Sequence, residues 1–236
     1  MKNRIWELDA LRGLCVLGMV VIHFVYDLVV LFRVLHWEFP AVYSFVQNWG
    51  GVLFLLISGI CVTLGSRSVR RGLIVFCCGL TVTAATALMY ILSLADKGII
   101  IYFGVLHCLG ICMLLWPVFR HLPVWALGAL GGALAAAGLL LQNITVSHFW
   151  FVPLGITYPG FFSSDYFPLL PHLGFFLLGA FLGKTLYRNK QTLLPGVNSR
   201  VLPLAFLQLC GKHSLWIYLL HQPILSGIAY LIYLLE

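Results

Sequence analysis

The first long apolar stretch of the chain, residues 11–32, carries three ionisable side chains: Arg12, His23 and Asp27. At about 100° per residue in a helix, these three fall within a sector roughly 80° wide. Ionisable groups are costly in hydrocarbon, and they usually face a bundle interior or a wet cavity where protons or charges are handled. The spacing therefore predicts chemistry inside a bundle of membrane helices.

His23 and Asp27 are four residues apart, so their side chains can meet on one helix face. A carboxylate beside an imidazole fixes the tautomer of the ring and raises its basicity, as in acyl-transfer sites. We interpret His23 as a base or nucleophile that Asp27 orients. A structural polar pair between helices is the alternative. His36, just beyond the outer end of this helix, is a second candidate base.

Arg12 precedes His23 by eleven positions, close to three helical turns, which places the two about 16 Å apart along the axis. The guanidinium would lie near the cytoplasmic end of the helix, where it can hold a phosphate from the cytosol. The alternative is that Arg12 anchors the helix end, paired with Asp9.

The composition predicts that helices carry these side chains across a membrane. Hydrophobic residues make up 61% of the 236 residues and charged residues 9%, and the mean hydropathy is +1.01. A soluble domain has about a quarter of its residues charged. Because apolar runs of roughly 20 residues recur and ten-residue alternation is absent, we expect an all-α integral membrane protein with about seven transmembrane helices around a polar cavity. The expected spans are 11–33, 45–65, 72–94, 101–119, 123–142, 167–186 and 213–234.

The basic residues fall mostly into the loops of one side. Between the expected spans, twelve of the fourteen Lys and Arg residues lie on one side and two, Arg33 and Lys97, on the other. The twelve include Lys2 at the amino terminus. By the positive-inside rule this places the amino terminus in the cytoplasm and the carboxyl terminus outside. No nucleic-acid-binding motif accompanies the scattered bases, so we expect no nucleic-acid partner.

Further polar side chains occur in or beside the later spans, and we expect them to bind a substrate. No metal site is predicted. Cys108 and Cys112 are four residues apart, but no second pair of ligand residues at such a spacing accompanies them, so we interpret them as small core residues. Hydrolase, nucleotide-binding, metalloprotease and dinucleotide motifs are absent from the sequence. The expected substrate-binding residues are His107, Asp165, Tyr166, His172 and His221.

Five segments together resemble bacterial proteins with a heparan-α-glucosaminide N-acetyltransferase catalytic domain. The resemblance spans nearly the whole chain, and the Asp-Tyr-Phe-Pro and His-Gln-Pro blocks are its most distinctive parts. Arg12 and His23 also reproduce the spacing of an Arg and a His in the first helix of the wider transmembrane acyltransferase superfamily. The segments are 8–14 (LDALRGL), 23–28 (HFVYDL), 53–59 (LFLLISG), 162–171 (FSSDYFPLLP) and 211–223 (GKHSLWIYLLHQP).

The resemblance implies transfer of an acetyl group from cytosolic acetyl-CoA to a sugar amine or hydroxyl across the bacterial inner membrane. Arg12 would help to hold the acyl-CoA, and His23 would lie at the acyl-transfer centre. The lysosomal enzyme of the family has Asn where His23 aligns and its catalytic His nearer His36, so the choice between the two stays open. The basic residues Arg67, Arg70 and Arg71 are expected to attract the CoA phosphates.

Two other functions would fit the same residues. One is a small transporter whose buried His and Asp residues relay protons. The other is a non-catalytic membrane subunit in which the polar residues only join helices.

We expect one domain over residues 1–236. The expected partners are the lipid bilayer, acetyl-CoA and a glycan or other small acceptor, and self-association is left open.

Overall fold

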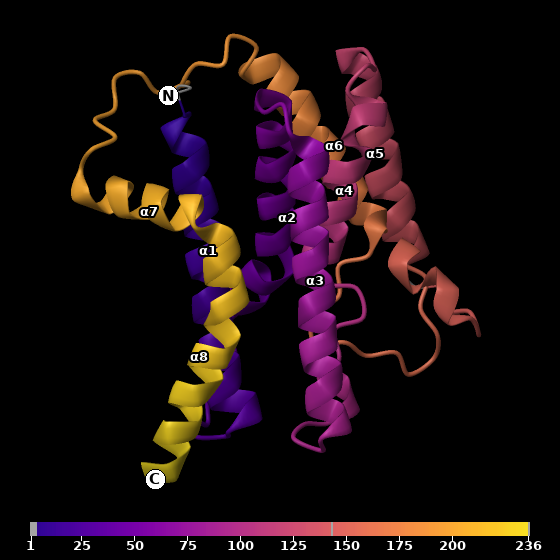
Figure 1. The fold of residues 1–236 in the computed structure, drawn as a ribbon, viewed down its shortest axis with the longest axis vertical. Helices are drawn as coiled ribbons and strands as arrows, with labels where there is room; N and C mark the ends of the chain where they lie inside the picture. The colour runs from indigo at the N-terminus through magenta and orange to yellow at the C-terminus, as the bar shows by residue number, and fades with distance from the viewer. Residues whose placement is uncertain (1–3, 143, 236) are drawn as a thin grey trace. The chain divides into compact units, whose positions relative to one another are not determined.

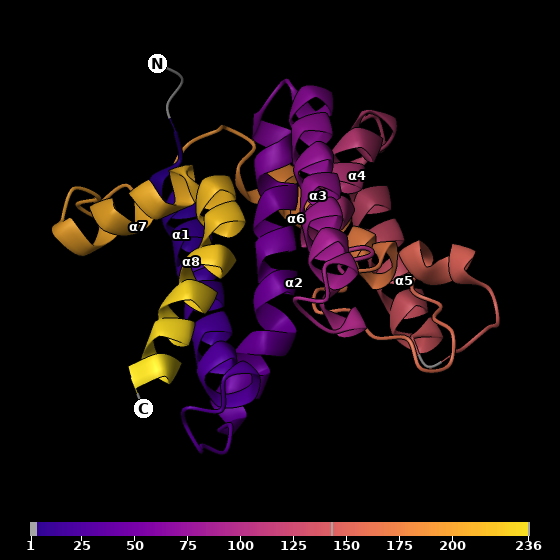
Figure 2. The same ribbon diagram turned by 60° about the horizontal axis from the view of Figure 1, so that its bottom comes forward.

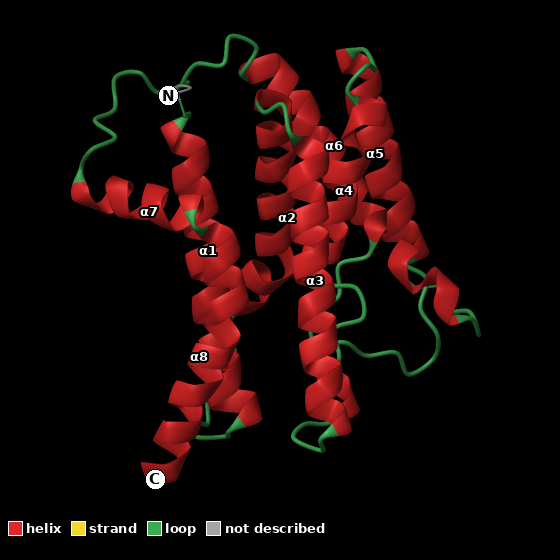
Figure 3. Cartoon of the chain, viewed as in Figure 1, coloured by secondary structure: helices red, strands yellow, loops and turns green. Residues whose placement is uncertain are grey.

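The computed structural model describes residues 4–142 and 144–235, and Lys2 lies outside them. Within the described residues the chain forms helices, and no strand occurs (Figure 3). A short π-helical turn, η1 (Asp27–Leu31), continues the first helix. The α-helices, labelled in Figure 1, are α1 (Trp6–Tyr26), α2 (Ala41–Leu64), α3 (Ser68–Ile91), α4 (Val105–Phe119), α5 (Val124–Leu141), α6 (Leu169–Leu186), α7 (Leu202–Lys212) and α8 (Ser214–Leu235).

Six of these helices are long and apolar enough to cross a membrane: α1 with η1, α2, α3, α5, α6 and α8. The apolar helix α4 has 15 residues, roughly 22 Å at 1.5 Å per residue, which is shorter than a hydrocarbon core of about 30 Å. The expected all-helical membrane architecture is therefore confirmed in the part of the chain that the structure describes, as six candidate spans plus α4. The sidedness of the termini and the enclosed polar cavity stay predictions.

Four helices begin four or five residues from their predicted starts: α1, α2 and α3 begin earlier and α4 begins later. Hydrogen bonds from distant polar groups account for the starts of α1 and α4. α1 begins before residue 11, since the buried Glu7 carboxylate accepts hydrogen bonds from Thr192 Oγ1 and from the Leu193 amide, both at 2.8 Å. α4 begins after residue 101, since the preceding segment is extended and Ser163 Oγ donates to the carbonyl of Ile100 at 2.9 Å.

The chain divides into two compact units. Unit 1 contains the described residues of 1–54 and 190–236, and unit 2 contains those of 55–189. The long helix α2 contributes residues to both. That residues 1–236 act as one domain stays a prediction.

In unit 1, α8 runs beside α1 and α7 crosses α1 (Figures 1 and 2). The crossing brings two backbones into contact through glycine. A Cβ on Gly13 would collide with the carbonyl of Leu207, and one on Gly211 with the carbonyl of Asp9. Such close approach is typical of small residues between membrane helices.

In unit 2, α3 packs against α4 and α5 against α6, while α4 also touches α6. The largest fully buried side chains of this unit include Phe176, Leu177 and Leu127. Two extended segments meet beside the start of α4, where Phe103 and Tyr166 form an isolated bridge. This unit therefore places the 162–171 block against the first turn of α4.

Candidate functional site

The ionisable side chains of the first span lie on one continuous stretch of helix, as expected: Arg12 and His23 on α1 and Asp27 on η1. All three belong to unit 1. α1 keeps regular α-helical turns through His23 and changes to π-helical turns at Asp27. Single π-helical turns inside α-helices are rare and often occur at functional sites. Asp27 itself keeps the α-helical spacing from His23, since its amide donates to the carbonyl of His23, and the π-helical turn changes the course of the residues that follow it.

His23 is hydrogen-bonded to His221 of α8, with 2.7 Å between His23 Nδ1 and His221 Nε2. The ring planes are 18° apart and the centroids 4.9 Å apart. The distance between the ring centroids exceeds the N···N distance by nearly the sum of the two centroid-to-nitrogen distances. Both nitrogens therefore lie close to the line that joins the ring centres, and between them. The rings thus meet edge to edge, with the hydrogen bond close to their planes, as an N–H donor and a ring lone pair require.

The partner of His23 is therefore His221 and not Asp27, and the expected Asp27–His23 contact is wrong. The carboxylate of Asp27 instead accepts hydrogen bonds from two side chains of α8. Gln222 Nε2 lies 2.9 and 3.0 Å from its two oxygens, and Ser226 Oγ lies 2.9 Å from Oδ2. Asp27 is only 1% exposed. A buried carboxylate needs such donors, and here α8 supplies them.

Gln222 and Ser226 were not among the predicted site residues. Gln222 belongs to the His-Gln-Pro block that the sequence marks as unusual, and its neighbour in that block, His221, was expected to bind substrate. Ser226 follows Gln222 by four residues, so the two share one face of an otherwise apolar helix. That spacing was the available signal for Ser226.

Arg12 lies half-buried beside the crossing of α1 and α7. Its Nη1 donates to the carbonyl of Gly211 at 3.4 Å and lies 3.7 Å from Asp9 Oδ1. Asp9 is buried and also lies 3.9 Å from Arg4 Nη1. The alternative of an ion pair with Asp9 is therefore present in the structure. A phosphate that binds Arg12 would compete with this pair.

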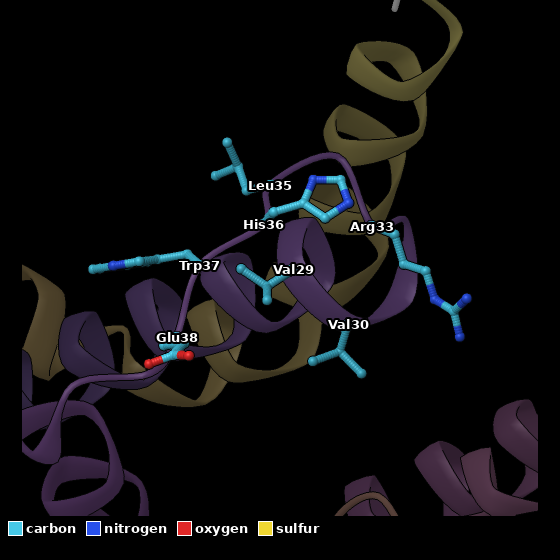
Figure 4. A pocket seen from close by; sticks show the side chains of 7 residues that line it. All are labelled: Val29, Val30, Arg33, Leu35, His36, Trp37 and Glu38. Atoms are coloured by element: carbon cyan, nitrogen blue, oxygen red, sulfur yellow. The ribbon is translucent and has the colours of Figure 1, made fainter.

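His36 lies outside α1, in the connection to α2, and is exposed. Figure 4 shows its ring at an open depression together with Arg33 and Glu38. The depression is lined by Val29, Val30, Arg33, Leu35, His36, Trp37 and Glu38. His36 is thus exposed beside two charged side chains, whereas His23 is hydrogen-bonded to His221.

Three arginines expected to attract CoA lie in unit 2, at and after the turn between α2 and α3, and all are exposed: Arg67, Arg70 and Arg71. Exposed guanidinium groups at one helix start can attract an anion. They belong to a different unit from Arg12, so a joint role in holding one CoA molecule stays a prediction.

His107 lies in the first turn of α4 and is buried. The Gly104 amide donates to its Nδ1 at 3.2 Å, so Nε2 carries the proton and faces Thr83 Oγ1 at 3.3 Å. The Thr83 hydroxyl in turn donates to the carbonyl of Ile101 at 2.6 Å. Both ring nitrogens of His107 thus bind the protein, and His107 caps the start of α4. The substrate contact expected of His107 stays a prediction.

Asp165 and Tyr166 also bind backbone groups. The Val105 amide at the start of α4 donates to Asp165 Oδ2 at 3.1 Å, and the Tyr166 hydroxyl donates to the carbonyl of Val152 at 2.7 Å. Burial raises the pKa of Tyr166 to about 12, so this hydroxyl remains a donor at neutral pH. Both residues hold the 162–171 block in place.

His172, one turn into α6, lies with Nδ1 2.7 Å from the carbonyl of Pro168. Because a carbonyl only accepts, Nδ1 carries the proton and Nε2 keeps its lone pair. Of the residues expected to bind substrate, His172 is therefore the one in unit 2 whose ring keeps an acceptor nitrogen. Among residues 4–142 and 144–235, no group of three or more His, Cys, Asp or Glu side chains is placed to hold a metal.

Comparison with known proteins gives one match. The sequence model of the family described as "Heparan-alpha-glucosaminide N-acetyltransferase, catalytic" matches residues 4–223, nearly the whole chain. The match includes both His23 and the His-Gln-Pro block that contains His221. Neither a curated protein nor a solved structure matches the chain.

Proposed function

Because the chain belongs to the heparan-alpha-glucosaminide N-acetyltransferase catalytic family, we propose that it moves an acetyl group from cytosolic acetyl-CoA to a sugar amine or hydroxyl beyond the membrane. The family is one of acetyltransferases, and six helices of this chain can span a membrane. The observation that carries the proposal is the hydrogen-bonded pair of His23 and His221 inside the α1 and α8 candidate spans.

His23 is the proposed acyl-transfer residue. An imidazole can attack a thioester as a nucleophile, or it can remove the proton of the acceptor as a general base. Either role requires one ring nitrogen with a free lone pair and a partner that holds the other nitrogen. His23 has such a partner in His221, which favours it over the exposed His36.

Arg12 is the proposed donor-binding residue. The phosphates of CoA would replace or join Asp9 at its guanidinium, which forms strong charge-assisted hydrogen bonds with phosphate. Arg67, Arg70 and Arg71 would raise the local concentration of the same anion.

The acceptor is proposed to bind through unit 2. His172 supplies an acceptor nitrogen for a sugar hydroxyl, and the neighbouring Asp165 and Tyr166 fix the segment that leads to it. The acceptor arrives from the outer side in this proposal, with the amino terminus cytoplasmic and the protein in the bacterial inner membrane.

The proposal is tested by calorimetric titration of acetyl-CoA into the purified chain in detergent. Micromolar binding to the wild type, weakened at least tenfold in Arg12→Ala, is expected. Arg33→Ala is the matched control, because Arg33 is an exposed arginine of the same unit at the other end of the first span, and it should bind as the wild type does. A folded wild type that binds no acetyl-CoA contradicts the proposal.

One observation also favours a second function. Two hydrogen-bonded imidazoles with a buried carboxylate one turn away can pass protons, as in proton-coupled transporters. Proton flux in vesicles that contain the chain and no CoA would identify that function. The absence of such flux would leave acetyl transfer as the one proposed function.

A further inference from the structure

The hydrogen bonds of His221 determine which of its ring nitrogens carries the proton. His221 Nδ1 lies 2.6 Å from the carbonyl oxygen of Tyr218, one turn earlier in α8. A carbonyl oxygen only accepts, so Nδ1 of His221 must be the donor. In the neutral ring the other nitrogen, Nε2, then has a lone pair and no proton.

This assignment determines the tautomer of His23 in turn. His221 Nε2 accepts, so the proton between the rings belongs to His23 Nδ1, 2.7 Å away. The remaining nitrogen of His23, Nε2, is left with its lone pair. The edge-to-edge arrangement of the rings, with planes 18° apart, supports a directed N–H···N bond rather than a face-to-face contact.

We propose that His221 positions His23 for the reaction: it holds the proton on His23 Nδ1, leaves Nε2 as the reacting atom, and takes up the Nδ1 proton when Nε2 forms a bond. The tautomer follows from the geometry alone, whereas the proton uptake rests on the proposed function. His221 thus acts through His23 and touches no substrate in this proposal, which replaces the substrate-binding role expected from the sequence.

In transfer through an acetyl intermediate, one proton moves between the two rings and returns. The Nε2 lone pair of His23 attacks the thioester carbon, the C–S bond breaks, and CoA leaves as a thiolate that takes a proton from water. The acetylimidazolium passes its Nδ1 proton to His221 Nε2. When the acceptor attacks the acetyl carbon and the N–C bond breaks, His221 returns this proton to His23 Nδ1, and the acceptor loses its own proton to water.

The same α8 segment binds the carboxylate that serves as a countercharge for the imidazolium that forms on His221. Gln222 follows His221 directly and, with Ser226, holds the carboxylate of Asp27. Asp27 lies one turn beyond His23, and side chains at this spacing have their Cβ atoms about 5–6 Å apart. Asp27 therefore stabilises the positive charge on the imidazole pair at a distance, without binding either ring.

Nitrogen-15 NMR of the histidine-labelled full chain in lipid nanodiscs tests the tautomer without any CoA. We expect His23 to be protonated at Nδ1 and unprotonated at Nε2. His107, whose Nδ1 accepts from the Gly104 amide, provides an internal reference for the opposite tautomer. Resonances are assigned by loss in His23→Gln and His107→Gln. A wild-type His23 protonated at Nε2 overturns the proposal, even if acetyl transfer is demonstrated.

Two variants separate positioning from simple structural support. In His221→Gln the amide oxygen can still accept from His23 Nδ1, so the tautomer should persist, but the amide cannot take up a proton, so kcat should fall roughly 100-fold with KM for acetyl-CoA within twofold. In His221→Phe the tautomer preference itself should be lost. His213→Gln, an exposed histidine of the same unit, is the control. The proposal is contradicted if His221→Phe keeps the wild-type tautomer of His23, or if both His221 variants keep the wild-type kcat.

The outcomes for the two proposals are distinguishable. If the wild type binds no acetyl-CoA, the acetyltransferase function fails while the His23 tautomer can still be measured. If acetyl transfer occurs and His23 shows the wrong tautomer, only the role of His221 fails.

Discussion

Each unit has a His and an Asp that the sequence marks as candidate site residues, and the two pairs differ in what they bind. In unit 1, His23 and Asp27 of the first span bind side chains of α8, namely His221 and Gln222. In unit 2, residues of the same two types, His107 and Asp165, accept hydrogen bonds from backbone amides at the start of α4. Residue type alone therefore does not distinguish the two groups, and their hydrogen-bond partners do.

The difference indicates where chemistry can occur. A helix start has four amides without helical partners, and a side chain that caps them cannot leave without exposing a buried donor. A pair of side chains from two helices can instead exchange a proton and keep its geometry. We infer that unit 1 holds the reacting groups and that the polar side chains around α4 mainly stabilise unit 2.

The largest expected effect is that of His23→Ala. Acetyl transfer should fall roughly 100- to 10,000-fold, because a positioned acid–base or nucleophilic group contributes about that much. The measurement is the initial rate of acetyl transfer from labelled acetyl-CoA at saturating donor.

His36→Ala is the matched comparison and should lose no more than about threefold, because His36 is exposed in the α1–α2 connection. If His36→Ala is the inactive variant and His23→Ala is active, the reacting group lies outside the paired histidines. The inference that unit 1 reacts through α1 and α8 would then be wrong.

The second prediction concerns the backbone contact that supports the polar side of α1. Gly13→Ala should lower the free energy of unfolding by about 1–3 kcal/mol, because its Cβ would meet the carbonyl of Leu207 and force α7 away. Gly18→Ala on the same helix is the control, since nothing lies within 4 Å of a Cβ there. Thermal unfolding followed by tryptophan fluorescence measures both. Equal stability of the two variants would contradict the described crossing.

Much of the fold follows from the sequence, because membrane helices need long apolar runs and those runs are visible. The expected spans locate each long helix to within a few residues. The starts of α1 to α4 deviate by four or five residues. At α1 and α4, hydrogen bonds from Thr192 and Ser163, which are distant in sequence, hold the chain in a way that the apolar pattern does not show.

The candidate site is less predictable for a related physical reason. Helical periodicity correctly placed Arg12, His23 and Asp27 on one helix, since that is a local property. Which groups on α8 they meet depends on how the two helices pack, and packing leaves no periodic signal in the sequence. The spacing of His23 and Asp27 therefore suggested a partner within one helix, whereas the structure pairs each residue with α8.

A third, smaller effect is expected in unit 2. Asp165→Ala should lower the free energy of unfolding by about 1 kcal/mol, the usual cost of removing a helix cap, because the Val105 amide loses its acceptor. The melting temperature should fall by roughly 2–4 °C for a chain of this size. Asp96→Ala, an exposed acid in the α3–α4 connection, should leave it unchanged. A raised KM for the acceptor at unchanged stability would break the contrast between the units and assign Asp165 to substrate binding.

The smallest effect is the coupling between Asp27 and Gln222. Their two hydrogen bonds, at 2.9 and 3.0 Å, join η1 to α8, but interhelical hydrogen bonds in membranes average only about 0.6 kcal/mol in double-mutant cycles, since each group finds other partners when the helices separate. We therefore expect the cycle of Asp27→Ala, Gln222→Ala and the double variant to give a coupling of about that size in unfolding free energy. A coupling near zero, with the His23 tautomer unchanged in every variant, would show that Asp27 acts through its charge alone. A coupling of several kcal/mol would instead make the α1–α8 contact primarily structural. The distinction drawn between the two units would then no longer hold.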